Sequence, residues 1–139
     1  MTASAGFSAY GTKLTVGAGA TEVKETTKID VDLGTVDDVD ITNNNSADAT
    51  EETVPGIIRT GVIDIEGNFV PTDTGQAALI TALQARTDDL AIVVTCADSG
   101  DATFTGTGRV KSFKQTNPYS GKAGFTSQIK VKGKLTFAA

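Results

Sequence analysis

Carboxylates are the residues of this chain whose number and spacing could support chemistry. The segment from Asp30 to Asp40 is rich in aspartate, but an EF-hand loop starting at Asp30 would need glycine at its sixth position and glutamate at its twelfth. Thr35 and Ile41 stand there, which excludes that calcium site. In a strand, Asp30 and Asp32 would lie on one side roughly 6.8 Å apart, and paired carboxylates could serve a glycosidase. A sugar cleft is usually lined with aromatic side chains and the chain has no tryptophan, so outward-facing strand carboxylates are expected instead.

Other reactive groups are scarce. The chain has no histidine, which removes the usual general base and the commonest zinc ligand. Its one cysteine, Cys96, ends a strand-like apolar run and lacks the histidine or cationic neighbour that would activate a thiol. The Gly17–Gly19 segment lacks the third glycine of a dinucleotide fingerprint. We therefore expect no enzyme, no cofactor and no metal site.

The length and the ends of the chain set its general class. With 139 residues, positions 1–139 are expected to form one domain, which can bury roughly 68% of the surface that the unfolded chain exposes. The N-terminus lacks the basic start and apolar core of a signal peptide. No run of the sequence approaches the roughly 18 apolar residues of a membrane helix. The expectation is a soluble protein made in a reducing cytoplasm.

Charge is distributed unevenly along the sequence. The net charge is −5, yet all 17 acidic residues lie in residues 1–101 together with five of the 12 basic residues. The other seven basic residues lie in 102–139, which contains no acid. Acidic and basic surfaces could meet between neighbouring copies, since complementary potentials fix register. They could equally neutralise each other within one sheet, and charge alone leaves both interpretations open.

Alternating apolar and polar residues indicate strands with one buried face. The alternation occurs at Leu14–Val16, Ile29–Leu33, Val39–Ile41, Ile63–Phe69, Thr103–Gln115 and Phe125–Phe137. The apolar run Leu90–Cys96 predicts a strand buried on both faces. The last strand has the clearest pattern, with Ile129, Val131, Leu135 and Phe137 on one face and Lys130, Lys132 and Lys134 on the other.

One helix and one long loop complete the predicted elements. Thr72 or Asp73 can cap the helix and Gln76 stands where a capping box requires it. The stripe of Leu79, Ile80 and Leu83 could lie on a sheet. Polar residues without periodicity predict a loop at about 42–57, including a Pro-Gly turn at Pro55. Loops of this length are usually functional or mobile.

The order of features from Glu51 to Arg86 resembles the central signature of the tail tube (major tail) proteins of long-tailed bacteriophages. An acidic loop, the Pro55 turn, a strand at Gly61–Glu66, Phe69-Val70-Pro71 and a capped helix follow in that order. A Gly-Thr-Lys-Leu strand opens at Gly11 and a basic strand closes the chain. The resemblance implies a mainly β fold (α+β), with sandwich- or barrel-like antiparallel sheets and one short flanking helix. It also implies a structural subunit that forms rings, usually of six copies, which stack into a hollow tube for DNA.

The resemblance also implies site residues and partners. The loop would reach the adjacent ring, and the candidates for contacts between subunits or rings are Asn43, Asn44, Asn45, Asp48, Glu51, Glu52, Pro55, Lys130, Lys132 and Lys134. Asp64 and Glu66 are candidates for the lumen lining, since carboxylates repel phosphate and let DNA pass without specific binding. Tape-measure and tail terminator proteins are expected partners. The expected place is a virion tail, assembled in the cytoplasm of a host bacterium.

Two alternatives remain open at this point. A tube component of a bacterial secretion or contractile injection system shares the same fold logic and differs in cargo. A monomeric β-barrel that binds a small ligand would need a larger, more aromatic interior than six Phe and two Tyr suggest.

Overall fold

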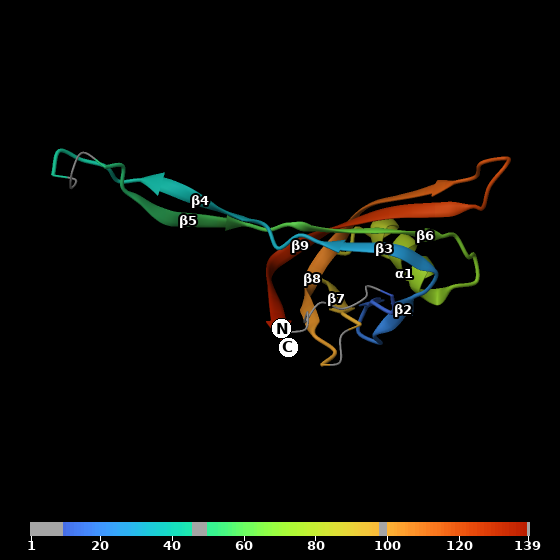
Figure 1. The fold of residues 1–139 in the computed structure, drawn as a ribbon. Helices are drawn as coiled ribbons and strands as arrows, with labels where there is room; N and C mark the ends of the chain where they lie inside the picture. The colour runs from blue at the N-terminus through green and yellow to red at the C-terminus, as the bar shows by residue number, and fades with distance from the viewer. Residues whose placement is uncertain (1–9, 46–49, 98–99, 139) are drawn as a thin grey trace, which may run out of the picture.

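The computed structural model describes residues 10–45, 50–97 and 100–138. Figure 1 shows a body of strands with one helix, and a thin two-stranded arm that projects from it. We use "arm" for β4 (Thr35–Asp40) and β5 (Thr53–Arg59), which pair with each other as a separate two-stranded sheet. The described remainder is the body.

The body is built on one antiparallel sheet of seven strands, in the order β2-β1-β7-β8-β9-β6-β3. The strands are β1 (Lys13–Val16), β2 (Thr21–Val23), β3 (Thr26–Val31), β6 (Val62–Asn68), β7 (Leu90–Thr95), β8 (Thr103–Thr116) and β9 (Gly124–Ala138). The sheet folds over into two layers, with β3, β6 and β9 above β2 and β7 in Figure 1. The prediction of a mainly antiparallel β fold with one short helix is confirmed.

Aliphatic side chains from both layers and the helix fill the interior. The fully buried ones include Leu14, Val16, Val23, Ile63, Ile65, Leu79, Ile92, Val94 and Ile129. The pattern predicted for the last strand holds through Leu135, but Phe137 is 57% exposed and stacks on Phe104 with 5.1 Å between ring centroids. Its position near the end of β9, outside the core cluster, explains the exposure. In β7 only Ile92 and Val94 are buried, so the prediction of two buried faces is wrong, because one face alone packs on the core.

Helix α1 (Thr74–Gln84) is capped by Asp73, as predicted. The Asp73 carboxylate accepts from the backbone N–H of Gln76 at 3.2 Å and from that of Lys24 at 3.1 Å. The buried Gln76 amide donates to the carbonyls of Lys24 and Asn68, and it accepts from the N–H of Val70. A capping box would turn this side chain back to the cap residue. Here it instead ties the helix to the ends of β2 and β6.

The arm corrects the predicted loop at about 42–57. Residues 53–59 form β5, in which Pro55 lies opposite Asp38 on β4. Pro55 and Gly56 are therefore inside a strand, at a register shift, and the predicted Pro-Gly turn is wrong. Each strand of a two-stranded ribbon keeps one edge unpaired, so a residue without a backbone N–H is tolerated there. The alternation at Val39 and Ile41 marks a strand as predicted, but both side chains are exposed because the arm stands away from the core.

Candidate assembly interface

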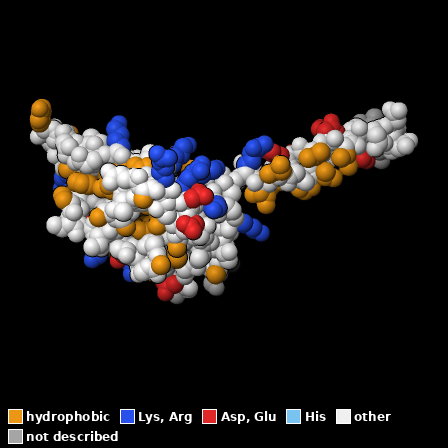
Figure 2. Space-filling model, turned by 180° about the vertical axis from the view of Figure 1, so that it is seen from behind, with side chains coloured by type: hydrophobic (Ala, Val, Ile, Leu, Met, Phe, Trp, Pro, Cys, Tyr) orange, Lys and Arg blue, Asp and Glu red, His pale blue; other side chains and the backbone are white. Residues whose placement is uncertain are grey.

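The arm exposes an unusual amount of aliphatic surface. Six of its side chains, or of residues directly at its end, are between 39% and 72% exposed: Val36, Val39, Ile41, Val54, Ile57 and Ile58. Figure 2 shows these hydrophobic patches running along the arm. A two-stranded hairpin alone is marginally stable in water, and contiguous exposed apolar surface usually marks an interaction site. The arm is therefore suited to being covered by another protein surface.

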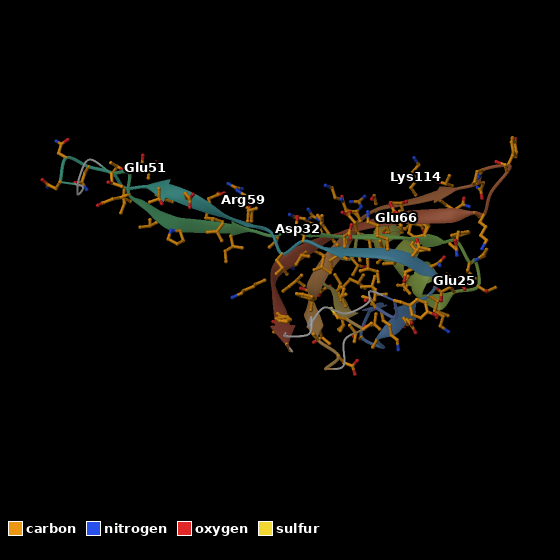
Figure 3. The ribbon with its side chains drawn as sticks, viewed as in Figure 1. Glu25, Asp32, Glu51, Arg59, Glu66 and Lys114 are labelled. Carbon is orange, nitrogen blue, oxygen red and sulfur yellow. The ribbon has the colours of Figure 1, made fainter. Side chains whose placement is uncertain are left out.

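Two glycines fix the base of the arm where its two connections to the body cross. A Cβ on Gly34 would collide with the carbonyl oxygen of Arg59, and Gly34 has a positive φ of +96°. A Cβ on Gly61 would collide with the carbonyl oxygen of Asp32. The Asp32 carboxylate also accepts from the N–H of Gly34 at 2.8 Å. Figure 3 shows Asp32 at this junction and Arg59 on the arm.

Substituting Gly61 is expected to change the direction of the arm. In a Gly61→Ala variant the backbones must separate, because backbone atoms, unlike a flexible side-chain end, cannot move aside locally. The body should keep its circular dichroism spectrum, whereas assembly visible by electron microscopy should fall sharply. Gly19→Ala is the matched control, since a Cβ there meets only the Thr21 hydroxyl at 3.9 Å. Normal assembly of Gly61→Ala would show that the arm's direction is unimportant.

The body has two free strand edges in one layer. Within the part of the chain that the structure describes, strand β3 pairs with β6 alone, and β7 pairs with β8 only as far as Gly108. Residues 109–116 of β8 therefore pair only with β9 among the described residues. The layer runs from the 109–116 segment through β9 and β6 to β3, with a free edge at each side. Exposed edges invite pairing with another chain.

The polar face of this layer carries opposite charges at its two sides. Strands β3 and β6 carry one basic residue, Lys28, and three acidic residues, Asp30, Asp64 and Glu66. The opposite side, residues 109–116 of β8 with 124–132 of β9, holds only cations: Arg109, Lys111, Lys114, Lys130 and Lys132. The cross-strand register places Glu66, Thr126 and Lys114 in one row across the face, and Figure 3 shows Glu66 and Lys114 on it. The uneven distribution of charge along the sequence thus becomes an acidic side and a basic side of one sheet layer.

Local contacts tune some of these charges. Lys28 lies 3.3 Å from Asp30, and the hydrogen bond and charge of that carboxylate, helped by Glu66, raise the pKa of Lys28. Asp64 accepts from the side-chain amide of Gln128 at 2.9 Å. On the arm, hydrogen bonds from the hydroxyl and the backbone N–H of Thr42 lower the pKa of Asp40. The raised pKa keeps Lys28 charged at neutral pH, and the lowered pKa does the same for Asp40.

The predicted contact residues fall in three places. Asn43, Asn44, Asn45, Glu51 and Glu52 lie beyond β4 and β5 at the far end of the arm, and all except the half-buried Glu52 are exposed; Asp48 lies outside the described residues. Pro55 lies within β5. Lys130 and Lys132 have partners within their own subunit, the carbonyl of Thr60 and the carboxylate of Asp88. Lys134 is exposed.

The basic edge segment 109–116 was missed by sequence reasoning. Arg109 shares Asp88 with Lys132, at 4.0 Å and 3.1 Å, beside a small pocket of about 280 Å³ at the base of the arm. Lys111 and Lys114 are exposed on the free edge. The available signal was the cluster of cations in residues 102–139. Its meaning depends on which strands lack a neighbour, and only the topology shows that.

Solved structures with the same arrangement of strands identify the fold. A chain from the virion of a native gene transfer agent particle matches with a TM-score of 0.79 and 16% identity, over 96% of this chain and 100% of that one. A chain from the tail of an empty gene transfer agent particle with C6 symmetry matches at 0.72 and 19% identity, over 92% and 94%. A chain from the sheath-tube complex of an extracellular contractile injection system matches at 0.74 and 11% identity, over 96% and 92%. This chain has the tail tube fold. No protein-family model and no curated protein matches its sequence.

The tail tube fold here is shared with particles of two kinds, tails and injection systems, so the fold does not separate those two settings. It confirms the resemblance read from Glu51–Arg86. Within the described residues of this tail tube fold, no helix is long and apolar enough to cross a membrane.

Proposed function

We propose that this chain is the structural subunit of a viral tail tube, whose copies form rings that stack into a hollow conduit for DNA. The observation that carries the proposal is the pair of free edges on one layer of the sheet, which border an acidic side (β3 and β6) and a basic side (β8 and β9). The likeness to a chain of a C6-symmetric tail supports rings of six copies. The role is non-enzymatic.

Rings form when the β3 edge of one copy meets the 109–116 edge of the next. Main-chain hydrogen bonds across such a junction give affinity, and complementary charge fixes register and rejects wrong pairings. The acidic side then faces the basic side at every junction of the ring. Closure leaves no free edge in the layer, which removes the aggregation hazard of the isolated subunit.

Stacking uses the arm. A head-to-tail contact repeats without closing and generates an open-ended tube. The arm projects from one end of the body (Figure 1), so its aliphatic surface and the polar residues at its far end reach a copy in the adjacent ring. This assigns Asn43, Asn44, Asn45, Glu51 and Glu52, together with Pro55 in β5, to contacts between rings. Lys130 and Lys132 belong to the basic side, Lys134 follows them on β9, and all three are assigned to the contact with a neighbouring copy.

The polar face of the layer, opposite the core, lines the lumen and includes Asp64 and Glu66. The register adds Lys114 and Lys130 to the same face, so the lining is mixed in charge rather than purely acidic. Strong DNA binding requires many unpaired cations that displace counterions from phosphates. Alternating carboxylates and amines reduce that attraction, so DNA can slide through.

In this role the chain works with tape-measure and tail terminator proteins, and it assembles in the cytoplasm of the host bacterium before it becomes part of a virion tail. The second candidate is the tube of a contractile injection system, which the match to a sheath-tube complex favours. Both candidates require the same rings and stacks.

Complementary charge reversals test the ring contact. Lys111→Glu with Lys114→Glu changes the net charge of residues 109–116 from +3 to −1. Asp30→Lys with Glu66→Lys changes the net charge of β3 and β6 together from −2 to +2. Each double variant alone should form no rings, because like charges then meet at every junction. An equal mixture should form rings of alternating copies and restore tubes seen by electron microscopy. Raising salt from 0.1 M to 1 M should weaken wild-type assembly before folding, since the Debye length falls from about 10 Å to about 3 Å. Normal assembly of either variant alone, or no rescue on mixing, would contradict this edge pairing.

A further inference from the structure

The turn between β8 and β9 presents a tyrosine that folding does not explain. Tyr119 is fully exposed, at a relative exposure of 110%, so it adds nothing to the core. The turn lies at the end of the body opposite the arm (Figure 1). Tyrosine is enriched among the residues that contribute most of the binding energy at protein interfaces.

Contacts within the turn restrain its backbone. The side-chain amides of Gln115 and Asn117 donate to each other in both directions. The N–H of Gly121 donates to the carbonyl of Pro118 at 3.4 Å, which closes the turn around Tyr119. An aromatic ring carried on such a turn loses little conformational freedom on binding.

The arm of another copy has the properties of a partner for this turn. Its exposed aliphatic side chains offer apolar surface for an aromatic ring. Asp38, Asp40, Glu51 and Glu52 make the arm acidic, and Lys122 in the turn is basic and exposed. The turn and the arm project from opposite ends of one molecule (Figure 1), so they cannot meet within a copy. Two copies in head-to-tail order bring them together.

We infer that Tyr119 of one copy packs on the aliphatic surface of the arm of the next copy along the tube, with Lys122 beside the carboxylates of that arm. This inference rests on the proposed tube and names the surface that the arm contacts. Tyr119 is then an anchor of the contact between rings, and it has no part in the contact within a ring. Removing the aromatic side chain of Tyr119 should therefore abolish stacking, while the subunits still assemble into single rings.

The first test compares two tyrosine substitutions. Tyr119→Ala should give folded protein that forms rings without tubes, and Tyr119→Phe should form tubes. Tyr10→Ala is the matched control, because Tyr10 is also exposed, at 92%, and lies outside the turn; it should form tubes. Tubes from Tyr119→Ala at the wild-type concentration would overturn the inference, as would loss of its rings or of its folding. Tubes formed by Tyr119→Ala leave the proposed function intact. A wild-type protein that forms neither rings nor tubes overturns both the inference and the proposed function.

The second test is a cross-link between copies. In a Cys96→Ser background, protein with Ser120→Cys, which keeps Tyr119, is mixed with protein carrying Ile57→Cys, and the mixture is oxidised under tube-forming conditions. A disulfide-linked dimer containing one chain of each kind is expected, with far less dimer from either protein alone. The control replaces Ser120→Cys with Tyr10→Cys and should give no such dimer. Tubes that form without the mixed dimer would overturn the inference.

Discussion

A chain in which residues 35–59 are replaced by a short Gly-Ser linker is expected to fold and to form no tubes. Among the described residues the strands of the arm pair only with each other, and its exposed aliphatic side chains lie outside the core cluster of the body. The junction below the arm is retained in this variant, because the N–H of Asp32 donates to the carbonyl of Val62 at 3.0 Å. Removing the arm therefore removes the stacking surface and leaves the core.

Circular dichroism and thermal unfolding of this variant should match the wild type, while electron microscopy should show at most single rings. A matched control shortens only the end of the arm, replacing residues 43–51, and should assemble weakly because β4 and β5 remain. Full-length tubes from the variant without the arm, at the wild-type concentration, would show that the arm is not an assembly element. Loss of folding would show instead that the arm stabilises the body.

Truncating Leu79 to alanine is expected to lower the free energy of unfolding by about 2–5 kcal/mol. Leu79 on α1 is completely buried in the core cluster with Ile63, Ile92 and their neighbours. The cavity left by the missing atoms adds to the lost burial of apolar surface. Denaturant unfolding of the subunit under non-assembling conditions measures the difference.

Ile80→Ala is the matched control for this prediction. Ile80 lies beside Leu79 on the same helix but is only half-buried and stands outside the core cluster. Its truncation should cost clearly less. If Leu79→Ala unfolds like the wild type yet fails to assemble, the buried face of the helix contacts another subunit, and the account of the core is wrong.

The helix and the longer strands of the body were readable from sequence because each obeys a local rule. Ile63, Ile65 and Ile129 alternate with polar residues and are buried, and Asp73 caps the helix as its position predicts. The three residues of β2 were too few for any periodicity to show. Pairing order was also invisible, because register depends on contacts between residues far apart in the sequence.

The arm shows that alternation of apolar and polar residues does not reveal what covers the apolar face. Val39 and Ile41 alternate with aspartates as a buried strand would, yet they are 46% exposed. An apolar residue that will be covered by another copy obeys the same pattern as one that is covered by its own core. The same ambiguity affects the candidate contact residues. Lys130, Lys132 and Lys134 follow one pattern in the sequence, yet Lys130 contacts Thr60 and Lys132 contacts Asp88 of their own subunit.

Electron microscopy of the purified protein over a range of concentrations tests the central claim most directly. The account predicts rings with six-fold symmetry and an open centre, in keeping with the C6 tail that contains a similar chain. At higher concentration those rings should stack into tubes of uniform diameter. Uniform monomers at every concentration, confirmed by sedimentation of the same samples, would contradict the claim that this chain assembles a tube.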